Sequence, residues 1–172
     1  MKAFYNKLVE IFKAEDTKDL YRTKGILNPK FIDLYAGQDF EPESFEIYPT
    51  PAIFVNWSID HRQTPSLASL SFRLCYQQLR DTSNLGKNTQ EALKFLDFIE
   101  ITDQILTSFE SECTGKLNPA TQELNIEPVV IDEYILTYTC SYTKNKDPQE
   151  VPTGEINEIQ VKSGLFTKLL DV

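Results

Sequence analysis

The sequence predicts an α+β domain, in which an antiparallel or mixed β-sheet carries one long helix and a short N-terminal helix on one face. Two observations lead to this class. Apolar residues recur at steps of three and four over residues 88–110, which is the pattern of a helix with a wide apolar face. Three other stretches, 52–59, 67–80 and 129–143, alternate apolar and polar residues, as strands with one buried face do.

The long helix has a start signal at its first residue. Asn88 is a residue type that caps helices, and Glu91 stands three positions later. This spacing predicts a capping box, in which each side chain bonds the backbone N–H of the other residue. The apolar face that follows is a packing surface, so we expect a core helix without chemistry of its own.

The segments before the first long strand are predicted in order. Residues 2–14 have an amphipathic pattern and predict a short helix. Residues 15–30 are polar and broken by Gly25, and they predict a loop. Residues 31–35 predict a short strand, and residues 36–51 a long acidic connection of the kind that is usually functional or mobile.

The chain after the long helix divides at residue 143. Residues 111–128 are polar and turn-rich and predict a loop before the last long strand. We therefore expect one α+β domain over residues 1–143, and over residues 144–172 a charged loop and an apolar tail that form an interface arm. The tail either folds back on its own core or docks on a neighbour, because contiguous apolar surface marks interaction sites.

Composition narrows the function classes. The 172 residues include 41% hydrophobic and 25% charged residues, which is typical of one soluble globular domain. A formal net charge of −9 disfavours nucleic-acid binding as the main activity, since phosphate contacts need a basic surface. We expect no signal peptide and no membrane span. Cys75, Cys113 and Cys140 match no metal or disulfide spacing and predict reduced thiols in a cytosolic protein.

The single histidine is the main catalytic candidate. His61 follows Asp60, and Ser58 or Ser66 would be the nearest nucleophile. Adjacent residues on a turn rarely share the hydrogen bond that such a site needs, so we expect a solvated loop histidine. The chain contains no nucleophile elbow, phosphate-binding glycine loop or zinc-protease motif, and we predict no catalytic residue and no cofactor.

Carboxylates are the candidate metal ligands. Glu41 and Glu43 form one group, and Asp97, Glu100 and Asp103 form another at helical spacing. A magnesium or calcium site needs several such oxygens to converge. A solvated acidic face explains both groups more simply, and we predict no metal site.

Several short segments of the sequence resemble those of a known protein family. Residues 31–38 read FIDLYAGQ, and residues 48–57 read YPTPAIFVNW after the acidic connection. Together with the alternating strand, the long helix and the final strand, they resemble the tail terminator proteins of phages and prophages, also called tail-completion or minor tail proteins. The resemblance covers roughly residues 1–143. The positions that carry it are Gln38, 51–54, 70–76, 88–110 and 132–142.

The resemblance implies a structural role. Tail terminators are small α+β subunits that assemble, commonly as hexameric rings, on the tail tube, where they stop its growth and join it to the head connector. The partners would be other copies of the chain, the tail tube protein and the head–tail connector. DNA would pass through without specific binding, and no membrane would be involved. The protein would act in the host bacterial cytoplasm during assembly and then in the virion tail.

A ring predicts contacts through the long connections and the tail. The expected interface residues are Gln38, Glu41, Glu43, Lys144, Lys146, Asp147, Leu165, Phe166, Leu169 and Leu170. Two alternatives remain open at this point. One is a monomeric acidic protein-binding module or inhibitor, and the other is a hydrolase or metal enzyme built on His61 or the acidic residues.

Overall fold

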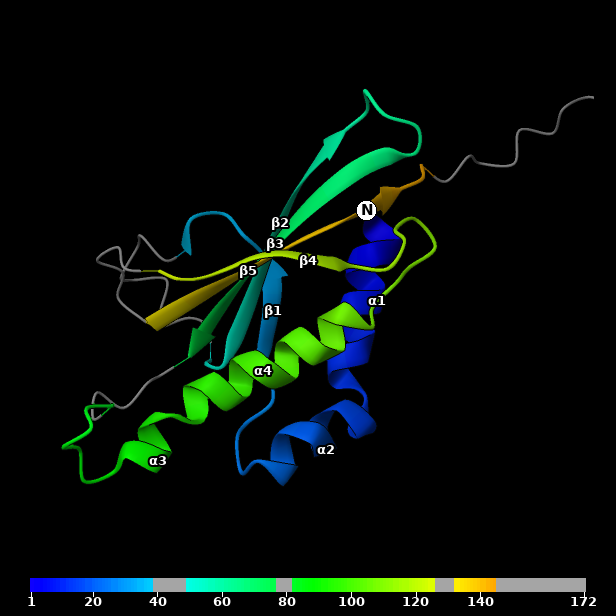
Figure 1. Ribbon diagram of the computed structural model, residues 1–172. Helices are drawn as coiled ribbons and strands as arrows, with labels where there is room; N and C mark the ends of the chain where they lie inside the picture. Colours follow the sequence, from blue (N-terminus) through cyan, green and yellow to red (C-terminus); the bar gives the residue numbers. More distant parts are fainter. Residues whose placement is uncertain (39–48, 77–81, 126–131, 145–172) are drawn as a thin grey trace, which may run out of the picture.

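The computed structural model describes residues 1–38, 49–76, 82–125 and 132–144 (Figure 1). It confirms the α+β class. Five strands form one sheet in the order β1-β2-β3-β5-β4. β1 runs parallel to β2 and the other neighbours are antiparallel, so the sheet is mixed. The strands are β1 (Phe31–Leu34), β2 (Ala52–Asp60), β3 (Ser66–Tyr76), β4 (Asn118–Leu124) and β5 (Asp132–Tyr142).

Helices cover one face of this sheet, as predicted (Figure 1). They are α1 (Lys2–Lys13), α2 (Glu15–Thr23), α3 (Thr89–Ala92) and α4 (Lys94–Thr107). Phe4 of α1 lies at the centre of the core, with ring centroids 5.3 Å from Phe109 and 6.5 Å from Phe72 of β3. The strands contribute their inward residues to the same core, which include Ile53, Val55, Leu70, Phe72, Leu74, Leu136, Tyr138 and Cys140.

The predicted long helix is confirmed over residues 89–107, with an interruption at Leu93 that separates α3 from α4. The predicted capping box is wrong. Asn88 precedes α3 but makes no side-chain cap hydrogen bond, because its backbone (φ −119°, ψ 34°) is outside the extended region of an N-cap. Glu91 instead points forward to Lys94, with 2.7 Å between Oε2 and Nζ.

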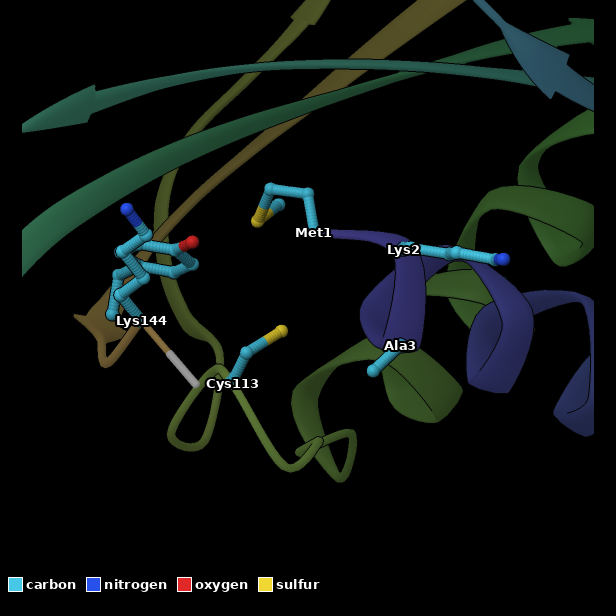
Figure 2. Close-up of a pocket in the computed structure, with 6 residues that line it drawn as sticks. Met1, Lys2, Ala3, Cys113 and Lys144 are labelled. Carbon is cyan, nitrogen blue, oxygen red and sulfur yellow. The ribbon is translucent and has the colours of Figure 1, made fainter. Parts of the chain in front are cut away.

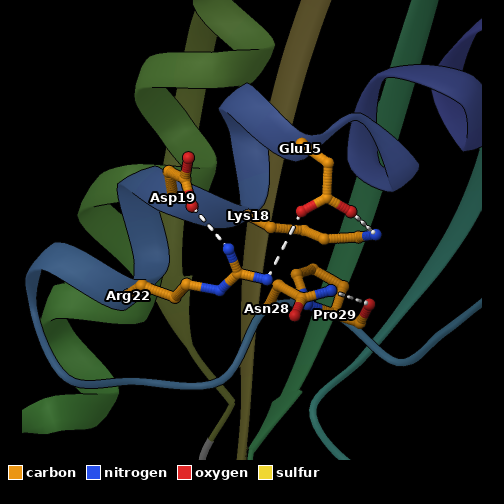
Figure 3. A network of polar contacts seen from close by, with 6 residues as sticks. All are labelled: Glu15, Lys18, Asp19, Arg22, Asn28 and Pro29. Carbon is orange, nitrogen blue, oxygen red and sulfur yellow. Dashed lines mark hydrogen bonds and ion pairs between the residues drawn. The ribbon is translucent and has the colours of Figure 1, made fainter.

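The predicted loop over residues 15–30 contains helix α2, so that prediction is also wrong. Acidic residues in the first turn favour the helix N-terminus, and ion pairs join Lys18 to Glu15 and Arg22 to Asp19 at 2.7 and 2.6 Å (Figure 3). Tyr21 anchors the helix, since its buried hydroxyl lies 2.9 Å from Thr102 Oγ1 of α4. The nine-residue helix is short and mostly polar, and it buries only Thr17 and Tyr21, so few apolar residues mark it in the sequence.

Strand β4 lies inside the predicted loop over residues 111–128. All seven of its residues are exposed, yet it pairs with β5 along its length. Because neither of its faces is buried, its sequence has no reason to alternate apolar and polar residues. The three cysteines are free and buried, as predicted for reduced thiols.

Candidate functional site

The sheet face opposite the helices is the main candidate site, and we call it the open face. Strand register assigns alternate residues to it: Phe54 of β2 pairs with Arg73 of β3, which pairs with Ile135 of β5. The alternation predicted for β3 is confirmed, because Leu70, Phe72 and Leu74 lie in the helix-side core. The open face includes Asp33, Phe54, Asn56, Ser58, Asp60, Ser69, Ser71, Arg73, Cys75, Glu133, Ile135, Thr137, Thr139, Ser141, Thr121 and Glu123.

A buried charged cluster lies at one end of the open face. Glu133 is fully buried, and its Oε2 accepts hydrogen bonds from Arg73 Nη1 at 2.8 Å and from Asn125 Nδ2 at 2.7 Å. The Arg73 guanidinium lies over the ring of Tyr35, 4.2 Å from its centroid. A buried carboxylate held by a guanidinium and an amide is a fixed, fully desolvated group. We call these four residues the Arg–Glu cluster.

Short hydroxyl side chains cover the middle of the open face. Ser69, Ser71, Thr137 and Thr139 are half-buried neighbours on β3 and β5. The hydroxyl oxygens of Ser71 and Thr137 lie 3.4 Å apart. The surface is therefore polar and carries no long side chain in this region, which suits contact with a partner or with passing polymer more than binding of a small molecule.

The turn between β2 and β3 brings His61 to one of its two candidate nucleophiles. His61 Nδ1 lies 3.0 Å from Ser66 Oγ. Asp60 does not serve as the third group of a triad, because its carboxylate binds Arg62 through both oxygens at 2.7–3.1 Å. That guanidinium lowers the pKa of the Asp60 carboxyl. His61 is exposed, so water has free access to this contact.

The helical carboxylates do not converge. Asp97 pairs with Lys24 at 3.5 Å, Asp103 accepts a hydrogen bond from the Tyr138 hydroxyl, and Glu100 is exposed. Within the described residues, no group of three or more histidine, cysteine or acidic side chains is placed to hold a metal ion. Glu41 and Glu43 lie outside the described residues.

Two of the predicted interface residues are described. Gln38 closes the turn after β1, since its amide donates to Leu34 O at 2.9 Å and accepts from Ala36 N at 2.7 Å. Lys144 follows β5 and lines a cavity of about 230 Å³ with Met1 and Cys113 (Figure 2). The two residues are at different places in the fold. The other predicted interface residues lie outside the described ranges: Glu41, Glu43, Lys146, Asp147, Leu165, Phe166, Leu169 and Leu170.

The Arg–Glu cluster was not predicted from the sequence. Arg73 and Glu133 each stand at a polar position of a predicted strand, where a solvated side chain is the ordinary expectation. Their pairing depends on the β3–β5 register. It places Arg73 beside Ile135, and Glu133 lies two residues away along β5 on the same face. A charged residue among apolar ones in a central strand is the signal that points to such a pair.

Comparison with protein-family models and with curated proteins gives no match. None of the described helices is long and apolar enough to cross a membrane. The fold and the open face therefore carry the functional argument by themselves.

Proposed function

We propose that the protein is a structural subunit of a phage or prophage tail, which caps the tail tube and joins it to the head connector as a ring of like subunits. The observation that carries this proposal is the two-faced sheet. One face is covered by α1, α2 and α4. The other is buried at one end, around Ala52, Phe54 and Cys75, and presents half-buried serine and threonine side chains over its middle. A subunit of a tube-capping ring needs one face that stabilises it and another that meets a neighbour or the lumen.

The edges of the sheet support assembly. β4 is the outermost described strand on its side, and all of its residues are exposed. Exposed edge strands present backbone groups to other chains, and proteins protect such edges or use them for contact. Contacts between two different patches of identical subunits close into a ring when the rotation between them allows it.

The charge of the open face supports passage of DNA. Register places the carboxylates of Asp33, Asp60 and Glu123 on this side of the sheet, and Asp60 is paired with Arg62. The guanidinium of Arg73 is bound to the buried Glu133 and is half-buried itself. An acidic or neutral wall does not retain phosphates, whereas a basic wall would hold them.

The functional test is growth of tail tubes in vitro. The tube protein encoded in the same phage or prophage is polymerised with and without this chain, and tube lengths are measured by electron microscopy. We expect shorter tubes with extra density at one end when the chain is present. Tubes of unchanged length with bare ends, when this chain is present in excess over the tube ends, would contradict the proposal.

A charge-reversal variant tests whether the open face lines the channel. Glu123→Lys adds a positive charge on an exposed β4 position where no described ion pair forms, so folding is retained. If the open face lines the channel, the variant rings should retain DNA at low salt. Glu112→Lys, an exposed position after α4, is the matched control and should not retain DNA. Equal DNA retention by both variants would contradict a channel lined by the open face.

A further inference from the structure

The outer edge of β2 is only partly covered. β1 pairs with the first four residues of β2, from Ala52 to Val55, although β2 continues to Asp60. On its other side, β2 is paired with β3 along its whole length. Among the described strands, none lies beside residues 56–60 on the outer side (Figure 1). We call this stretch the β2 edge.

The backbone of the β2 edge is oriented for a further strand. Tyr35 N–H donates to Val55 O at 2.9 Å on the outer side, directly after β1 ends. Backbone groups of an antiparallel strand alternate between its two sides, so Trp57 and Ile59 direct their N–H and C=O groups outward as well. The edge therefore offers two donors and two acceptors to an incoming chain.

A cavity lies where β1 stops. It has a volume of about 190 Å³ and is lined by Leu34, Tyr35, Val55, Asn56 and Trp57. Leu34 is 44% exposed, and Trp57 and Ile59 are half-buried against the helix-side core. A strand placed here would cover these apolar side chains. The opposite edge at β4 is exposed on both faces, and a strand there would bury less apolar surface.

The chain contains a segment with the matching pattern. Over residues 158–162 the apolar Ile159 and Val161 alternate with polar Glu158, Gln160 and Lys162. The β2 edge alternates in the same way, with Trp57 and Ile59 toward the helices and Asn56 and Ser58 on the open face. Strand side chains alternate between the two faces, so one register places both apolar sets on the helix side.

The path of the chain brings this segment to the correct end of the sheet. Tyr142, the last residue of β5, pairs with Ser66 immediately after the β2–β3 turn. β5 therefore leaves the sheet at the same end as the β2 edge. The residues between 144 and 158 span up to about 45 Å when extended, which reaches a neighbouring subunit.

We propose that residues 158–162 add a strand to the β2 edge of a neighbouring copy of the chain. The inference rests on the proposed ring and names the contact that closes it. Residues 158–162, which we call the arm, and the β2 edge are different patches. The contact is therefore head-to-tail, and it closes into a ring when the rotation between subunits allows it. Main-chain hydrogen bonds supply the affinity, and Ile159 and Val161 supply the register.

The test is cross-linking between two single-cysteine variants of the full chain. Ser58→Cys places a thiol on the exposed part of the β2 edge, and Gln160→Cys places one on the arm. The two variants are co-expressed with different tags and treated with a short bis-maleimide, which tolerates a shift of register. The native cysteines are buried, and untreated wild-type chain measures their background. Thr121→Cys, on exposed β4, replaces Ser58→Cys in the matched control.

We expect a cross-linked pair that carries both tags with Ser58→Cys, and at least fivefold less with Thr121→Cys. A cross-link that forms only within one chain, in the double variant Ser58→Cys/Gln160→Cys, would overturn the exchange between subunits. Rings seen by microscopy without any cross-link would overturn the arm contact and leave the ring proposal standing. Absence of rings and of interchain cross-links, both alone and with added tail tubes, would overturn both proposals.

Discussion

Arg73 and Glu133 form an ion pair across β3 and β5, with 2.8 Å between Nη1 and Oε2, on the sheet face that the helices leave open. Glu133 is fully buried, and Asn125 and Cys75 approach the same carboxylate. A buried carboxylate is tolerated when cationic and hydrogen-bonding groups surround it. This pair therefore ties the central strands together where the open face is most deeply covered.

Removal of the cation should be costly. We expect Arg73→Leu to lower the free energy of unfolding by about 3–5 kcal/mol, because the buried carboxylate loses its charged partner. Urea denaturation of both proteins measures the difference. Arg73→Leu combined with Glu133→Leu should recover part of the loss, since no buried charge remains. A single variant as stable as the wild type would contradict a desolvated pair.

The hydroxyl of Tyr21 holds α2 against α4. Tyr21→Phe removes its hydrogen bond to Thr102 Oγ1, and we expect a loss of about 1 kcal/mol, the usual net value for one hydrogen bond. Tyr5→Phe is a matched control, since that half-buried hydroxyl donates to Ile32 O at the sheet periphery, and it should cost less. Equal losses in urea denaturation would contradict the anchoring role of Tyr21.

Alkaline pH should destabilise the fold through the buried tyrosines. Burial raises the pKa of Tyr21, and burial together with the Asp103 carboxylate raises the pKa of Tyr138. Below pH 10 both are protonated in folded and unfolded chains. Above pH 10 the unfolded chain loses these protons first, so the free energy of unfolding should fall as pH rises. The free energy of unfolding of Tyr21→Phe should fall less steeply than that of the wild type over pH 10–11.5. An identical slope would contradict the raised pKa of Tyr21.

The buried thiol of Cys140 should resist alkylation. Burial, followed by the nearby Cys113, raises the pKa of the Cys140 thiol to about 11. The thiolate is the reactive form, so little of it is present at pH 8. We expect iodoacetamide to leave Cys140 unmodified in native protein and to modify it in 8 M urea, as peptide mass spectrometry would show. Rapid modification of native protein would contradict its burial.

The core elements are predicted well because the apolar residues of each one recur at the period of its own secondary structure. Residues 52–59, 67–80 and 129–143 have a clear alternation. β5 lies within the last range, and β2 and β3 match the first two except that each includes one further residue, Asp60 and Ser66. The helix at residues 88–110 is confirmed for the same reason over residues 89–107. A continuous buried face leaves a continuous pattern in the sequence.

The elements that were missed lack such a face. β4 is exposed on both sides, and α2 buries only Thr17 and Tyr21, so neither element has an extended buried face. The candidate site was predicted less well for a related reason. The Arg–Glu cluster depends on strand register, which local patterns do not specify. Most predicted interface residues, such as Leu165 and Phe166, lie outside the described ranges.

A truncation of the C-terminal tail distinguishes a role in assembly from a role in folding. Deletion of residues 158–172, which removes the segment proposed to contact a neighbour, should abolish ring formation and leave the urea midpoint within experimental error. Light scattering and urea denaturation of the same sample measure both properties. A truncated protein that is unfolded would instead assign the tail to its own core.

The most direct test of the proposed ring is the mass of the purified full-length protein in solution by light scattering, with negative-stain images of the same sample. We predict a mass of about six subunits and ring-shaped particles with a central hole, alone or on the ends of added tail tubes. A protein that stays monomeric both alone and with tail tubes would contradict the tail-terminator proposal.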